Sequence, residues 1–329
     1  MLKCRKDKGI KMKYYKLALT FEEQADLLIS KGLSGDRHRL IETLKVVNYY
    51  HLAPYWTYFQ KEDGSFENDA QFENVCKLYV FDRQLRYLVS DAIGRIEIAV
   101  KSLIITLFSK EYGAFGYLDV NNFSKNFQAL QHSRLIHEIR RRTEKSKEEF
   151  IKHYLQKYEQ TRDLPFWMAA EMMTFRNVIT VYRNIEHYLQ RDISRHYDLP
   201  AKVFNSWLPA LLYVRKICLF QSNLWDRELP VKPLLPNAKN APEWHNPVKF
   251  DNDRIFVILC ILRYMLNYVS PGSNWPKRLE ELLSIHPEIP LGYMGFPEKW
   301  TDCFLWTEIR TTEIFLSPGS ETTPIWKEK

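Results

Sequence analysis

The chain has 329 residues, of which 47 are Lys or Arg and 40 are Asp or Glu, so its formal net charge is +7. Hydrophobic residues make up 45% of it and aromatic residues 14%, a composition that can bury a large core and excludes wholesale disorder. Only 11 glycines are present, which argues against a β-rich or Rossmann-like chain, because both use Gly at many turns.

The positive charge is concentrated at the N-terminus. Residues 1–16 hold seven basic side chains and one acidic one, so they contribute +6, while the remaining residues contribute +1. We expect this segment to be a basic, flexible tail, either an arm that follows RNA phosphates or leader sequence before an alternative start at Met12. It lacks the apolar region of a signal peptide, and the longest apolar stretch, 255–262, is too short to span a membrane. These features predict a cytoplasmic protein without membrane contact.

Apolar residues recur at helical spacing along most of the chain, and neither strands nor internal repeats stand out. Thr20 and Glu23 form a predicted capping box that opens a helix ending at Ser30. Further helices are predicted over 36–47, 71–108, 128–143, 146–159, 165–189 and 203–220. In the 71–108 helix, Asp91–Arg95 and Glu97–Lys101 are spaced as i,i+4 ion pairs.

Five prolines between positions 230 and 247 exclude a regular helix there. We therefore predict a main helical domain over 17–229, a Pro-rich linker over 230–250 and a C-terminal extension over 251–329 that packs on the main domain. The extension is predicted to contain helices over 251–269, capped by Asp251 or Asn252, and over 276–285, followed by a loop-rich end. The predicted fold class is all-α.

Common catalytic motifs are missing from the sequence. It contains no phosphate-binding G-x-x-x-x-G-K-[ST] loop, no H-E-x-x-H zinc motif and no G-x-S-x-G nucleophile turn. The five cysteines lie far apart, and His132 and His137 are five residues apart, on different faces of a helix. We therefore predict no metal and no cofactor.

One segment carries a family signature. Residues 207–227 have the sequence WLPALLYVRKICLFQSNLWDR. It resembles the Abi-like (AbiD/AbiF) abortive-infection proteins, in which this stretch typically runs W-L-x-x-L-x-x-V-R-N-x-C-A-H-H-x-R-L-W-N-R. Other stretches that match in the same order are LTFEEQ at 19–24, VNYY at 47–50, LYVFDRQLR at 78–86, AIGRIEIA at 92–99, LPFWMAAE at 164–171 and MGFP at 294–297 with Trp300.

The resemblance implies a ribonuclease of the HEPN type, an all-α bundle that often dimerises. Its signature is an Arg and a His separated by four to six residues at a helix end. In metal-free RNA cleavage a neutral imidazole accepts the proton of the ribose 2′-OH, which attacks the adjacent phosphorus. The guanidinium stabilises the charge that develops on the phosphorane. The resemblance also implies RNA as a partner, either a target or a cognate structured noncoding RNA.

The chain departs from the signature at the positions that carry this chemistry. The residues at those positions are Arg215, which is kept, Lys216 in place of Asn, Phe220 and Gln221 in place of the two His, and Asn223 in place of the second Arg. A Phe cannot carry a proton, and a Gln amide does not titrate. We therefore expect an inactivated ribonuclease. The alternatives are a divergent RNA-binding or regulatory protein on the same scaffold, an enzyme whose His comes from elsewhere, and a protein-binding scaffold.

Some residues outside the signature are also candidates. Arg95 and Glu97 are expected to shape the site, the alternative being an ordinary surface ion pair. The predicted RNA-binding residues, which alternatively form a solvated helix face, are Arg140, Arg141, Arg142, Lys145 and Lys147. Tyr49, Tyr50, Tyr55 and Trp56 are candidates for stacking on unpaired bases, or else for the core or a dimer interface.

Overall fold

The computed structural model describes residues 17–158 and 163–307. The predicted N-terminal tail and part of the predicted C-terminal extension, 308–329, lie outside these ranges. Within these ranges the regular secondary structure is helical, and β-pairing is limited to two isolated β-bridges. The all-α prediction is thus confirmed. In the described part of the chain, no helix combines the length and the apolar character that crossing a membrane requires.

The α-helices of the described residues are, in chain order, α1 (Phe21–Ser30), α2 (Arg37–Val46), α3 (Tyr49–Trp56), α4 (Phe72–Tyr112), α5 (Ala129–Lys145), α6 (Glu149–Lys157), α7 (Phe166–Ala169), α8 (Phe175–Asn184), α9 (His187–Arg195), α10 (Ala201–Leu219), α11 (Ile255–Val269) and α12 (Trp275–Ile285). The short 3₁₀ helices are η1 (Thr57–Phe59), η2 (Gly116–Leu118), η3 (Val120–Asn122), η4 (Ala170–Met172), η5 (Pro242–Trp244), η6 (Leu291–Met294) and η7 (Trp300–Asp302).

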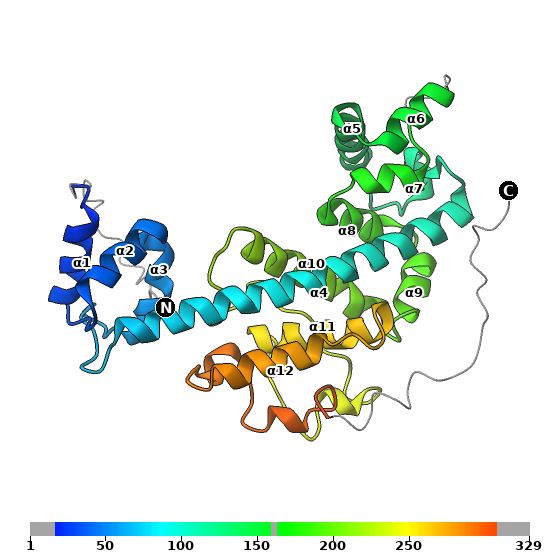
Figure 1. The fold of residues 1–329 in the computed structure, drawn as a ribbon. Helices are drawn as coiled ribbons and strands as arrows, with labels where there is room; N and C mark the ends of the chain where they lie inside the picture. Colours follow the sequence, from blue (N-terminus) through cyan, green and yellow to red (C-terminus); the bar gives the residue numbers. More distant parts are fainter. Residues whose placement is uncertain (1–16, 159–162, 308–329) are drawn as a thin grey trace, which may run out of the picture.

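The 41-residue helix α4 is the axis of the molecule. At 1.5 Å per residue it is about 60 Å long. Helices α1–α3 gather at its N-terminal end and α5–α8 at its C-terminal end, while α10, α11 and α12 lie along its middle (Figure 1). Buried side chains recur along it at steps of three and four residues from Phe81 to Phe108, so a continuous core forms along its length.

Local signals fix several helix ends where the sequence predicted them. The side chain of Thr20 accepts from the backbone N–H of Glu23, and the Glu23 carboxylate accepts from the N–H of Thr20, which completes the predicted capping box of α1. Helix α4 ends where Gly113 adopts φ +78°, a backbone conformation that suits Gly at a helix C-terminus.

The predicted 165–189 helix is wrong, because this stretch is divided into α7, η4, α8 and α9. Thr174 and Asn177 form their own capping box and start α8, and extended backbone at Ile185 and Glu186 separates α8 from α9.

The predicted cap of α11 is also wrong. Helix α11 starts at Ile255, because the Asn252 side chain donates to the carbonyl of Pro233 instead of capping a helix.

The Pro-rich segment is joined to the rest of the chain by specific contacts. The indole Nε1 of Trp207 donates to the carbonyl of Leu234 at 2.8 Å, and the Trp244 ring lies 5.5 Å from that of Trp207. Helices α11 and α12 of the C-terminal part pack against α4. Gly295, with φ +83°, lies so close to Arg254 that a Cβ atom would come within 2.5 Å of the Arg254 Cβ.

A buried polar network connects α4 to the segment that follows α10. One Asp82 oxygen, Oδ1, accepts from the backbone N–H groups of Leu224 and Trp225, at 3.1 and 2.9 Å, and Oδ2 accepts from the Tyr55 hydroxyl at 2.7 Å. Arg86, one turn further along α4, forms a buried ion pair with Asp82 and donates to the carbonyl of Ser222 at 3.3 Å. Burial raises the pKa of Asp82 to about 6, against the opposing effect of Arg86 and the other donors, so the carboxylate is charged at pH 7.

Asp82→Asn should lower the free energy of unfolding by about 3 kcal/mol, because removing one partner of a buried ion pair leaves the other charge uncompensated. Urea denaturation followed by circular dichroism measures this change. Asp91→Asn is the matched control, since Asp91 lies on the same helix and forms a partly exposed pair with Arg95. It should cost less than about 1 kcal/mol. Equal costs for the two variants would show that the buried network does not hold the fold.

Candidate functional site at the end of α10

The signature segment contains the last turns of α10 and the chain reversal that follows. The N–H of Gln221 donates to the carbonyl of Cys218, and the N–H of Ser222 donates to that of Ile217, which together make a Schellman motif. Gln221 is the residue of this motif with a left-handed backbone, with φ +54°. The motif ends the helix and directs residues 222–225 toward Asp82 on α4. The chain reversal is therefore held by its own backbone bonds and by the buried network.

Arg215 faces α4 and pairs with Glu97. Its Nη2 lies 2.9 Å from Glu97 Oε2, and the two side chains are 33% and 14% exposed. The contact is an ion pair by distance, since no N–H is aligned on that oxygen. Burial raises the pKa of Glu97, while Arg215 and Lys101 oppose the shift. The predicted i,i+4 pair of Glu97 with Lys101 is wrong, because Lys101 pairs with Glu171 at 3.0 Å.

Arg95 and Glu97 thus serve different parts of the molecule. Arg95 pairs with Asp91, as predicted, and its Nη1 donates to the Ser273 hydroxyl at 2.8 Å, in the loop before α12. Two residues apart on a helix, the two side chains point about 200° apart. Glu97 contacts the signature segment, whereas the contacts of Arg95 join α4 to the C-terminal part of the chain.

The two positions of the signature histidines lie on the surface. Phe220 is 78% exposed and Gln221 is also exposed, so neither side chain is needed by the core. The Asn223 side chain donates to Asp226 and accepts from Arg227, which holds the turn after the helix. Neither Phe220 nor Gln221 can exchange a proton near neutral pH, so these two positions supply no general base.

Two further residues of the segment lie in the last turn of α10. Lys216 lies in the last turn of α10, and its carbonyl accepts from the N–H of Phe220. Burial raises the pKa of Cys218 to about 11, so its thiol stays protonated at neutral pH and is not an activated nucleophile.

A cavity of about 550 Å³ adjoins the signature segment. Its lining includes Asn223 and Asp226 of the segment and three tyrosines from other elements, Tyr50, Tyr58 and Tyr293. Tyr50 is 77% exposed, whereas Tyr55 and Trp56 are buried in the core. Of the predicted stacking residues, Tyr50 therefore lines this cavity, while Tyr55 and Trp56 have the structural role that was the alternative.

The predicted RNA-binding residues fall into different environments. Arg140 makes two hydrogen bonds with the Asp163 carboxylate, at 2.6 and 2.7 Å, and Arg142 pairs with Glu138 at 3.3 Å. Arg141 and Lys145 make no ion pair within the described residues. Together with Arg142 they line a hollow of about 350 Å³ beside Met172 and Met173. Lys147 is exposed and does not line the hollow.

Charged side chains along α4 connect this hollow with the signature helix. Arg215 pairs with Glu97, Lys101 lies one turn further along α4, and Lys101 pairs with Glu171, which lines the hollow. Sequence spacing alone does not predict the pair of Lys101 with Glu171, because the members of this connection come from three distant segments. A signal for the Asp82–Arg86 network was present, because two opposite charges at i,i+4 interrupt an apolar stretch of α4.

Comparison with known families identifies the scaffold. The family model for Abi-like proteins matches residues 42–226, which make up more than half of the chain. The chain belongs to the Abi-like family. It is therefore a protein of the abortive-infection type, and the matched region of this Abi-like protein extends from α2 to the end of the signature segment. Neither the comparison with curated proteins nor that with solved structures gave a match.

Metal-binding groups do not gather at the site of this Abi-like protein. Across 17–158 and 163–307, no three His, Cys, Asp or Glu side chains lie in an arrangement that could hold a metal ion. Among the histidines, His51 on α3 is close enough to Arg86 to be affected by its charge, and burial together with that charge lowers the pKa of His51.

Gln221→Gly should raise the free energy of unfolding by about 1 kcal/mol, because a left-handed backbone is costly for a residue with a Cβ and not for Gly. Thermal or urea denaturation measures the change. Lys77→Gly, at an exposed position inside α4, provides the opposite control. It should lower stability by about 1 kcal/mol, since Gly is a poor helix former. Loss of stability in both variants would argue against the Schellman motif.

Proposed function

We propose that this Abi-like protein is a cytoplasmic phage-defence protein of the HEPN ribonuclease type that binds RNA without cleaving it. The observation that carries the proposal is that the signature segment keeps its structural contacts but has no histidine at positions 220 and 221. Arg215 is paired with Glu97 and the chain reversal is bonded to Asp82, yet the two positions of the histidines carry Phe220 and Gln221 at the surface. The scaffold for the chemistry is retained, while the group that would accept the 2′-OH proton is replaced.

Exposed groups in two parts of the molecule support RNA as the partner. Arg141 and Lys145 are basic side chains without an acidic partner in the described residues, so their charge is available to phosphates. The tyrosine-lined cavity next to Asn223 offers rings on which an unpaired base can stack. Charged side chains lie along α4 between the hollow and Arg215, so one RNA strand that runs along this helix could contact both the hollow and Arg215. A cognate noncoding RNA and a target RNA would use the same groups.

We further propose that the protein acts as a homodimer. Leu219 and Phe220 are 64% and 78% exposed, and two consecutive apolar side chains at the tip of the signature helix lose contact with water when a second chain covers them. A dimer that buries this tip would bring two signature segments together. Sedimentation of the purified chain tests the association, and Phe220→Ser should shift it toward the monomer.

Restoring the signature should create a ribonuclease. The variant Lys216→Asn/Phe220→His/Gln221→His should cleave RNA in the presence of EDTA, because it places an imidazole near Arg215 with no metal required. Both histidine positions are exposed, and His tolerates left-handed backbone better than most residues do, so the fold should accept the changes. Gel analysis of a labelled single-stranded RNA gives the readout, with a 2′,3′-cyclic phosphate expected at the new end.

The control is the same triple variant with Arg215→Ala, which should lose the activity. An inactive triple variant that still binds RNA would favour the alternative function, a noncatalytic RNA-binding or regulatory protein. Cleavage by the unaltered chain would contradict the proposal and indicate a His from elsewhere. His51 would then be the side chain to replace, since its lowered pKa keeps the imidazole neutral at pH 7.

Arg141→Ala/Lys145→Ala should weaken RNA binding in a salt-dependent way. If both side chains contact phosphates of a single strand, their loss should reduce the slope of log affinity against log salt by about 1.4. Fluorescence anisotropy with a labelled RNA over a series of salt concentrations measures the slope. Lys239→Ala/Lys249→Ala removes the same charge from exposed positions in the Pro-rich segment and should leave the slope nearly unchanged. Equal slopes for both double variants would show that only net charge matters.

A further inference from the structure

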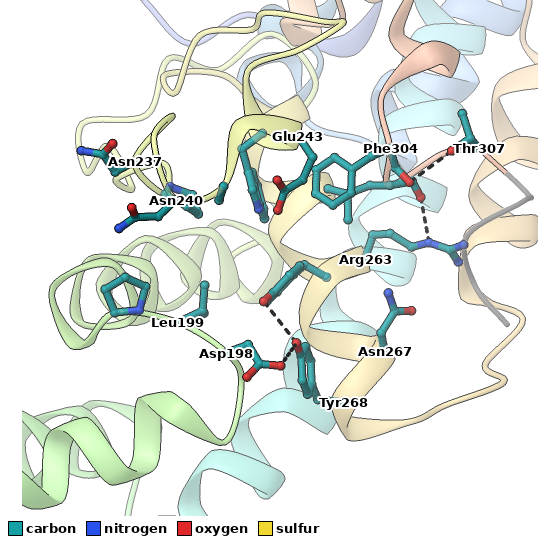
Figure 2. Close-up of a pocket in the computed structure, with 16 residues that line it drawn as sticks. Asp198, Leu199, Asn237, Asn240, Glu243, Arg263, Asn267, Tyr268, Phe304 and Thr307 are labelled. Atoms are coloured by element: carbon teal, nitrogen blue, oxygen red, sulfur yellow. Dashed lines mark hydrogen bonds between the residues drawn. The ribbon is translucent and has the colours of Figure 1, made fainter. Parts of the chain in front are cut away.

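A second cavity, of about 500 Å³, lies away from the signature segment. It forms where the turn before α10, the Pro-rich segment, helix α11 and the chain around Phe304 meet (Figure 2). Most of its lining comes from residues after position 226, so it is built largely by the part of the chain beyond the family match. The RNA-binding groups proposed above do not line it.

Aromatic rings make up much of its wall. The Trp244 ring lies 5.4 Å from the rings of both Tyr264 and Phe304, and Trp244 is buried against Trp207. The Tyr264 hydroxyl donates to the carbonyl of Tyr197 at 2.9 Å, which fixes the ring. These faces are apolar, and each carries the negative face potential that attracts cations.

Two carboxylates add negative charge to this wall. Asp198 accepts from the Tyr268 hydroxyl at 2.9 Å, and Glu243 lines the cavity from the Pro-rich segment (Figure 2). Neither carboxylate makes an ion pair with a basic side chain in the part of the chain that the structure describes. Burial raises the pKa of Tyr264, and the charges of Asp198 and Glu243 raise it further, so both carboxylates act on the same region of the cavity.

The basic side chain in the lining does not compensate these charges. Nε of Arg263 donates to the carbonyl of Leu305 at 3.0 Å, on the side of the cavity away from Asp198 (Figure 2). The acidic side chain that acts on Arg263 is Glu280, on α12, and not Asp198 or Glu243. The cavity therefore combines apolar rings with two carboxylates whose charge is left for a ligand.

We propose that this cavity binds a small organic cation, an ammonium or guanidinium group carried on an apolar body. The cation would be held between Asp198 and Glu243 by charge-assisted hydrogen bonds, and its body would lie on the rings of Trp244, Tyr264 and Tyr268. The amides of Asn237, Asn240 and Asn267 at the lining supply further hydrogen-bonding groups. Two sources carry this chemistry, a free polyamine and the side chain of a Lys or Arg in a peptide.

Isothermal titration of the full chain with benzylamine and with benzyl alcohol tests the charge directly, since the two probes have nearly the same shape. Benzylamine should bind and benzyl alcohol should bind at least tenfold more weakly. Glu243→Gln and Asp198→Asn should each weaken benzylamine by about fivefold or more. Asn suits the left-handed backbone at Asp198, where φ is +49°, so that variant should keep its fold.

Glu149→Gln is the matched control, because Glu149 is an exposed carboxylate on α6 that does not line the cavity, and it should leave benzylamine binding unchanged. Spermidine and the peptide Gly-Lys-Gly distinguish the two sources, and tighter binding of either one supports the cation site and names its ligand class. Equal binding of benzyl alcohol, benzylamine binding that survives both cavity variants together, or no binding of any amine would overturn the proposal. RNA binding should be the same in all these variants, so a failure here is separate from a failure of the RNA proposal.

Discussion

The buried carboxylate of Asp82 determines where the end of the signature segment lies. A charge removed from water must be paired and hydrogen-bonded, and Asp82 meets this requirement with donors from three places in the chain. The Tyr55 hydroxyl comes from α3, the Arg86 guanidinium from α4 itself, and the backbone N–H groups of residues 224 and 225 from the segment after α10. The Asp82 carboxylate can accept all of these bonds only when the three elements are arranged as they are here.

The geometry of the candidate site follows from this constraint. With residues 222–225 held on α4, the last turns of α10 must run alongside the same helix, and Arg215 meets Glu97. The side chains of Phe220 and Gln221 have no part in these contacts and are exposed to solvent. The side chains at these two positions can therefore vary without loss of a core contact.

The basic residues illustrate how similar charges acquire different roles. Arg140, Arg141 and Arg142 are consecutive, so their side chains point in directions about 100° apart around α5. Arg140 meets Asp163, Arg142 meets Glu138, and Arg141 opens into the hollow with Lys145. Within the part of the chain that the structure describes, two of these three arginines are therefore paired with acidic residues, and only Arg141 is left to bind a phosphate. The groups left for a phosphate are those that the neighbouring acidic residues do not reach.

The sequence by itself determined the helical class, several helix ends and the family, because helical periodicity, capping residues and the signature are all local. It located α1 by its capping box, and it identified the altered positions Phe220 and Gln221. Only the tertiary structure decided which charges meet. The i,i+4 spacing predicted a pair of Glu97 with Lys101, yet Glu97 pairs with Arg215, more than a hundred residues away, and Lys101 pairs with Glu171. Ion pairing depends on distances in space and on burial, and the order of residues along the chain fixes neither.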